Sequence, residues 1–164
     1  MAKQVIRAAL DYETLPDPPG EEFYRLRAAC FVSIKKDGEL RGCIGTLEPA
    51  EQDLGQEIIR NAQSAAFGDP RFPAVTSEEF YHLFFSVDVL GSPEAVAAKD
   101  ELDCKNYGVI VSHEYRRGVL LPDLEEVEDV DHQLGIACQK AGIVPSEEYA
   151  VQRFTVTRLH ENRS

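Results

Sequence analysis

Two β-rich runs joined by a two-residue turn constrain the fold of this chain more than any other feature. The first run, residues 28–36, contains Cys30-Phe31-Val32-Ser33-Ile34, and the second extends over residues 39–46. β-Branched and aromatic residues favour strands. Asp37-Gly38 lies between the runs and is a strong signal for a tight hairpin turn. The sequence therefore predicts an antiparallel hairpin in this part of the chain.

Further elements follow from the spacing of apolar residues. Helical spacing predicts helices in residues 2–11, 54–65 and 131–141, and Gly142 supplies a stop for the last one. The capping-box residues Thr76 to Glu79 predict a short helical turn. Alternation predicts a strand at 83–90, a second hairpin formed by 107–112 and 118–121 with 113–117 as its connection, and a last strand at 152–157.

Six strands and three or four helices without strict βαβ alternation are typical of an α+β fold. We therefore expect a mixed, mainly antiparallel sheet with flanking helices. The chain has 164 residues, of which 43% are hydrophobic and 28% charged. This length and balance suit a single domain over residues 1–164 that folds without disulfides or a structural metal.

The charge balance disfavours several classes of partner. Seventeen basic and 29 acidic side chains give a formal net charge of -12, so the mean field repels nucleic acids and anionic membrane surfaces. The N-terminus lacks the apolar core of a signal peptide, and no run approaches the ~18 apolar residues of a membrane span. We expect a cytoplasmic protein that binds neither nucleic acid nor membrane.

A local basic patch is the exception to the acidic composition. Its members lie close together in the sequence: Arg25, Arg27, Lys35, Lys36 and Arg41. Such a patch suits a small anionic ligand better than a polymer.

The four cysteines are scattered, which in a reducing compartment predicts free thiols: Cys30, Cys43, Cys104 and Cys138. The cysteines and histidines also lack the clustered spacings of zinc sites, so no metal site is predicted. The oligomeric state is not set by any of these patterns.

The run Leu40-Arg41-Gly42-Cys43-Ile44-Gly45-Thr46 resembles the signature of the AMMECR-type family. The resemblance continues through segments that span nearly the whole chain: 64–66, 69–73, 108–111, 118–122, 140–142 and 153–154. The family pattern often has a second proline after the position of Pro73, where this chain has Ala74. This departure concerns a turn.

The resemblance implies an AMMECR-type fold and leaves open two subdomains around a cleft. Prokaryotic proteins of this kind are known as protein A of the AmmeMemoRadiSam system, so it also implies a Memo-like protein and a radical-SAM protein as partners. The chain has no Cys-x-x-x-Cys-x-x-Cys run, so iron-sulfur chemistry would belong to the partner. No cofactor is predicted for this chain.

Cys43 is the candidate catalytic residue. In a strand from residue 40 to 45, Arg41 and Cys43 share one face, and a neighbouring guanidinium favours the reactive thiolate. Gly42 and Gly45 expose backbone amides that could hold an anion. Together with Thr46, these residues are predicted to contact a ligand.

A nucleophilic cysteine usually has a histidine within hydrogen-bond reach. The candidates are His82, His113, His132 and His160, and none lies in a family motif. The alternative is that Cys43 is a small buried apolar residue and that the glycines serve a bulge or tight packing.

The segment Asp69-Pro70-Arg71-Phe72-Pro73 fixes the local geometry around an arginine. Arg71 could present its guanidinium to a carboxylate or phosphate, with Asp69 beside it. Alternatively, Arg71 pairs with a carboxylate of the protein itself. Two hypotheses therefore stay open: a small-molecule or anion site around Cys43, or a protein-binding or regulatory module without enzymatic activity.

Overall fold

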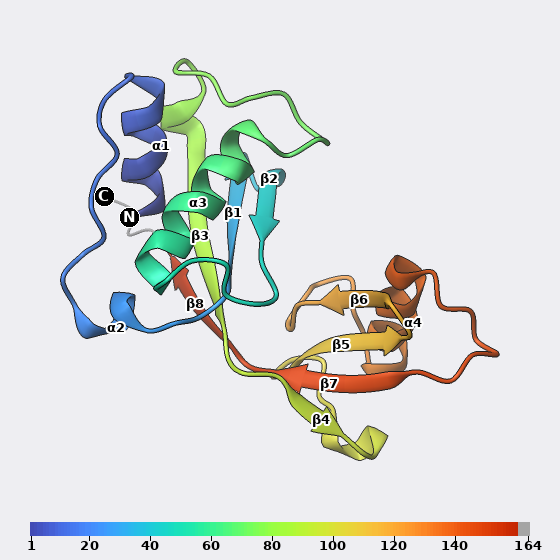
Figure 1. Ribbon diagram of the computed structural model, residues 1–164. Coiled ribbons are helices and arrows are strands. Elements are labelled where there is room, and N and C mark those ends of the chain that lie inside the picture. The colour runs from blue at the N-terminus through green and yellow to red at the C-terminus, as the bar shows by residue number, and fades with distance from the viewer. Residues whose placement is uncertain (161–164) are drawn as a thin grey trace. The chain divides into compact units, whose positions relative to one another are not determined.

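The computed structural model describes residues 1–160, and it divides into two compact units (Figure 1). Of the described residues, unit 1 comprises Met1–Leu90 and those from Thr157 to His160, and unit 2 comprises Gly91–Val156. The chain was expected to form one domain, and each unit is described separately below. Among the described residues, no helix has the length and apolar character needed to cross a membrane.

Unit 1 contains one four-stranded sheet with the strand order β2-β1-β3-β8. Its elements are α1 (Ala2–Leu10), α2 (Glu22–Arg25), β1 (Cys30–Lys36), β2 (Glu39–Gly45), α3 (Leu54–Phe67), β3 (Leu83–Leu90) and β8 (Val156–His160). β1 pairs antiparallel with both β2 and β3. Asp37 and Gly38 both have positive φ, 52° and 85°, as a tight hairpin turn requires. The predicted first hairpin is therefore confirmed.

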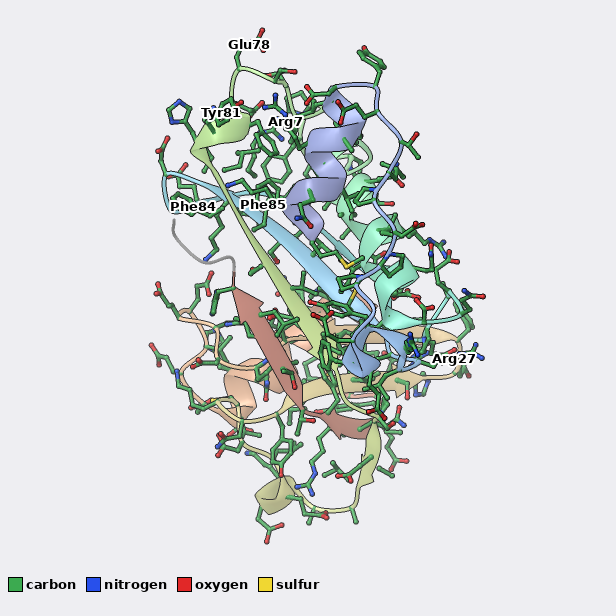
Figure 2. The ribbon with its side chains drawn as sticks, turned by 90° about the vertical axis from the view of Figure 1, so that its left-hand side faces the viewer. Arg7, Arg27, Glu78, Tyr81, Phe84 and Phe85 are labelled. Carbon is green, nitrogen blue, oxygen red and sulfur yellow. The ribbon has the colours of Figure 1, made fainter. Side chains whose placement is uncertain are left out.

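Helices α1 and α3 pack on one face of this sheet (Figure 1). That face consists of buried apolar side chains, among them Val32, Ile34 and Val87. Figure 2 shows Phe84 and Phe85 pointing to opposite sides of β3, and Phe84 is 47% exposed whereas Phe85 is 5% exposed. The face of the sheet that carries Phe84 is therefore partly exposed to solvent.

Unit 2 contains a second four-stranded sheet with the order β4-β7-β5-β6. Its elements are β4 (Glu94–Val96), β5 (Gly108–His113), β6 (Arg116–Leu120), α4 (Val130–Ala141) and β7 (Ala150–Phe154). β5 pairs antiparallel with β6 and with β7. The core combines apolar residues of this sheet and α4 with residues of the connecting segments, namely Leu102, Cys104, Val127 and Ile143. The α+β fold with mainly antiparallel sheets is thus confirmed, and each sheet carries helices.

The number of strands was underestimated, because the described residues form eight rather than six. β4 has only three residues, too few to show alternation. The single strand predicted at 152–157 is two strands, β7 and β8, which belong to different sheets. Alternation continues through the break at Thr155, whose carbonyl oxygen accepts a hydrogen bond from Gly91 N at 2.8 Å.

Candidate functional site

Cys43 lies on β2, the strand at the edge of the first sheet. Its own backbone groups are bonded by a loop rather than by a further strand. The N–H of Cys43 donates to Asp69 Oδ2 at 3.0 Å, and Arg71 Nη2 donates to the carbonyl oxygen of Cys43 at 3.2 Å. The loop residues Asp69 and Arg71 therefore supply the acceptor and the donor that a neighbouring strand would supply.

Asp69 and Arg71 form a close ion pair. Arg71 Nε and Nη2 lie 3.0 Å and 2.8 Å from the two carboxylate oxygens, and the backbone N–H of Arg71 donates to Oδ1 at 3.0 Å. The hydrogen bonds from Arg71 hold the pKa of Asp69 well below its usual range, although burial opposes this shift. The Asp69 side chain is 1% exposed and that of Arg71 is 55% exposed. Arg71 thus pairs with a carboxylate of the protein and also lies beside Cys43.

The Cys43 thiol is 3.3 Å from the hydroxyl oxygen of Ser33, its cross-strand neighbour on β1. Burial raises the pKa of Cys43, and the hydrogen bond with Ser33 and the charge of Arg71 offset only part of this effect. The thiolate that the sequence led us to expect beside Arg41 is therefore disfavoured. Desolvation outweighs the nearby positive charge, and Arg71 rather than Arg41 supplies that charge.

Arg41 is bound to Glu79. Its Nε and Nη2 lie 2.8 Å and 3.0 Å from the two carboxylate oxygens. This contact is the main reason why the pKa of Glu79 is lowered. The Arg41 side chain is only 12% exposed. Its third nitrogen, Nη1, is buried and has no hydrogen-bond partner within residues 1–160.

Phe72 lies close to both arginines. Its ring centroid is 6.0 Å from the guanidinium carbon of Arg41 and 5.5 Å from that of Arg71. The loop from Asp69 to Glu79 therefore brings Arg71 to the backbone of Cys43 and binds the side chain of Arg41 through Glu79. We call Arg41, Cys43, Asp69, Arg71 and Phe72 the Cys43 cluster.

Gly42, Gly45 and Thr46 have packing contacts that account for their residue types. A Cβ atom at Gly42 would collide with the backbone oxygen of Ala65 on α3, and one at Gly45 would collide with the Phe31 ring. The Thr46 hydroxyl donates to the carboxylate of Glu57 on α3. Through these contacts β2 packs closely against α3 and β1.

None of the four histidines hydrogen-bonds to Cys43 within the described residues. His113 Nδ1 contacts the backbone oxygen of Glu148, and His132 Nδ1 accepts from Glu128 N. His82 lies in the turn before β3, and His160 ends β8. Nowhere in residues 1–160 do three His, Cys, Asp or Glu side chains converge as metal ligands.

Sequence reasoning missed Ser33 and Phe72 as members of this environment. A regular hairpin with Asp37-Gly38 at its turn would place Ser33 opposite Gly42. The register shifts by one between Ile34 and Lys35, so that Ser33 lies opposite Cys43 instead. The glycines beside Cys43 are consistent with a bulge, but the sequence does not indicate at which residue the register shifts.

Known proteins are similar to this chain over most of its length. A protein of Clostridium acetobutylicum is 49% identical over 150 residues, which cover 92% of this chain but 32% of that protein. A Thermotoga maritima protein is 49% identical over 140 residues, covering 84% of this chain and 80% of its own length. This chain thus spans about a third of the first relative and four-fifths of the second.

A solved structure has the same fold. The crystal structure of uncharacterized protein PH0010 from Pyrococcus horikoshii superposes with a TM-score of 0.88 at 29% sequence identity. The superposition covers 98% of this chain and 87% of the other. The family model described as AMMECR1 matches residues 1–159, so the match extends across both units. On these grounds the chain belongs to the AMMECR1 family.

Proposed function

We propose that the Cys43 cluster binds a small molecule through a carboxylate or phosphate group. The observation that carries this proposal is the buried, unpartnered Nη1 of Arg41. A buried donor without an acceptor costs about 1–3 kcal/mol, and more when it is charged. An anionic oxygen at this nitrogen would remove that cost.

Two further features favour an anionic ligand. The Arg41 guanidinium is fixed by its two bonds to Glu79, so its third nitrogen is already oriented. Arg71 is held by Asp69 while more than half of its side chain is exposed. A ligand group could therefore bind without first ordering either arginine, which favours affinity.

In this proposal Cys43 contacts the ligand as a neutral thiol and does not attack it. Burial raises the thiol pKa, and no histidine within residues 1–160 is hydrogen-bonded to it. Non-covalent recognition is therefore better supported than thiolate catalysis.

The test is calorimetric titration with two probes, inorganic phosphate and malonate. We expect Arg41→Gln to weaken binding of the preferred probe by at least tenfold and Arg71→Gln to weaken it severalfold. Arg60→Gln is the matched control, because Arg60 is an exposed arginine paired with Glu51 on the same unit. Circular dichroism checks that each variant is folded. Equal affinities in Arg41→Gln and Arg60→Gln, or no binding of either probe, would contradict the proposal.

We also propose that the chain acts with partner proteins, namely a Memo-like and a radical-SAM protein. The family resemblance suggests these partners. In the Clostridium relative, the region similar to this chain makes up 32% of the protein.

Co-purification with the Memo-like and radical-SAM proteins of the same organism tests this second proposal. A stable complex that survives Arg41→Gln would show that partner binding and anion binding use different surfaces. The absence of a complex with either protein would count against it.

A further inference from the structure

Unit 2 contains a groove of about 560 Å³ along α4, separate from the Cys43 cluster on unit 1. One wall is a stripe of α4 residues at helical spacing, including Asp131, Leu134, Gly135 and Cys138. The other wall comes from the segment after α4, through Ile143, Val144, Pro145 and Tyr149. This volume lies within the range of small-molecule sites.

Gly135 is the feature that most needs an explanation. It lies in the interior of α4, where glycine costs about 1 kcal/mol relative to alanine. Close packing does not require it, because a Cβ atom at this position would meet nothing within 4 Å. The missing side chain instead leaves open space in the wall of the groove.

The groove wall is largely apolar. Leu134, Ile143 and Val144 contribute aliphatic surface, and Val144 is 53% exposed although it is a large apolar residue. Tyr149, on the same wall, is 36% exposed. Removing such surface from water favours binding of an apolar ligand.

The polar groups of the groove are neutral or already paired. Burial raises the pKa of both Cys138 and Tyr149, and these two side chains hydrogen-bond to each other. The carboxylate of Asp131 forms an ion pair with Lys99. A charged ligand would therefore find no unpaired opposite charge among these groups, whereas a neutral one can exchange a hydrogen bond with the Tyr149 hydroxyl.

We propose that this groove binds an uncharged, mainly apolar small molecule with one hydrogen-bonding group directed to Tyr149. The site is independent of the anion site on unit 1. The depth created by Gly135 determines whether the ligand fits, and Tyr149 determines how it is oriented.

The proposal is tested by NMR titration of the full chain with indole, an uncharged aromatic molecule with one N–H donor. We expect saturable shifts at the amides of Gly135, Cys138 and Tyr149. Gly135→Leu should fill the groove and weaken indole binding at least tenfold, and Tyr149→Phe should weaken it severalfold. Gly20→Leu is the matched control, because a side chain there also meets nothing within 4 Å and lies on unit 1.

A second probe tests the charge argument. Indole-3-acetate has the same ring with a carboxylate and should bind at least tenfold more weakly than indole. Three outcomes would overturn the proposal. They are the absence of saturable binding, equal indole affinity in Gly135→Leu and Gly20→Leu, and equal affinity for the two probes. Concentration-dependent self-association that disappears in Gly135→Leu would assign the groove to a second copy and would also overturn it.

Discussion

The Asp69–Arg71 ion pair acts on β2 as a substitute for a peptide group. The carboxylate accepts from the N–H of Cys43, and the guanidinium donates to its carbonyl oxygen. Edge strands expose such groups to solvent unless something covers them. Both prolines of the segment 69–73 restrict the loop that carries this pair. Covering the edge of β2 is therefore a sufficient structural role for this segment, even without a bound ligand.

Asp69→Asn should lower the free energy of unfolding by about 2 kcal/mol at pH 7, because charge-assisted hydrogen bonds at a buried carboxylate are lost. The folded-state pKa of Asp69 is lowered. The Asp69 carboxylate therefore stabilises the folded protein fully at pH values above its unfolded-state pKa of about 3.9. This stabilisation is lost as the pH falls through the folded pKa. The difference between the two proteins should therefore shrink below about pH 4, as measured by urea unfolding.

Asp103→Asn is the control for this series, since Asp103 also accepts backbone and side-chain hydrogen bonds but is only half-buried. A stability difference for Asp69→Asn that stays constant down to pH 2 would contradict the assigned cause.

Cys43 should react slowly with iodoacetamide at pH 7, since burial raises its pKa and only the thiolate reacts. The rate should increase with pH beyond the range of an ordinary thiol. Arg71→Gln should raise the pKa further, because Arg71 supplies the nearby charge. Arg41→Gln should change it much less. Site-resolved mass spectrometry separates Cys43 from the other cysteines, and rapid alkylation at neutral pH would refute this expectation.

At the scale of elements, each sheet has a glycine at a place where a helix packs closely on it. Gly42 of β2 faces the backbone of Ala65 on α3, and Gly118 of β6 faces the backbone of Ala137 on α4. In both places a Cβ atom would overlap a helix carbonyl oxygen. Helix and strand backbones can approach this closely only because the side chain is absent.

Gly42→Ala and Gly118→Ala should each lower the free energy of unfolding by about 1–3 kcal/mol, the usual effect of overpacking. Gly20→Ala should be nearly neutral, because its Cβ would meet nothing within 4 Å. Thermal and urea unfolding of the three variants test this ranking. A neutral Gly42→Ala would mean that α3 moves away from β2 without cost.

Local patterns predicted most elements, and non-local pairing decided the rest. The hairpin was predictable because Asp37-Gly38 fixes the turn, and α3 because its apolar spacing is regular. The contacts of Arg41 with Glu79 and of Arg71 with Cys43 were not predictable, since the loop from 69 to 79 reaches β2 only in the folded chain. The register shift between Ile34 and Lys35, which places Ser33 opposite Cys43, was likewise not predicted.

The prediction for Cys43 had a different weakness. The sequence placed a thiol near a guanidinium, which favours the thiolate, but it gave no measure of desolvation, which opposes it. Burial decides the direction of the pKa shift, and burial depends on the complete fold.

At the scale of the whole molecule, unit 2 is an insertion between two neighbouring strands of unit 1. β3 ends at Leu90 and β8 begins at Val156, and these strands are adjacent in the sheet. The hydrogen bond from Gly91 N to Thr155 O brings the two connections together. Each unit also has its own cluster of buried apolar residues.

Replacing residues 92–155 with a short glycine-containing turn should therefore leave a unit 1 that folds on its own. We expect a cooperative urea transition by circular dichroism and, if the anion proposal is correct, phosphate or malonate binding like that of the full chain. Residues 91–156 made as a separate chain are the complementary sample. A deletion variant without a cooperative transition would show that unit 1 depends on unit 2.

The insertion also determines the order in which the two units can be completed during synthesis. All strands of the second sheet leave the ribosome before β8, the last strand of the first sheet. Unit 2 can thus reach its final pairing while β3 still lacks its neighbour on one side. Nascent or prematurely terminated chains that end before residue 156 would expose β3 as an open edge, and such edges recruit other chains.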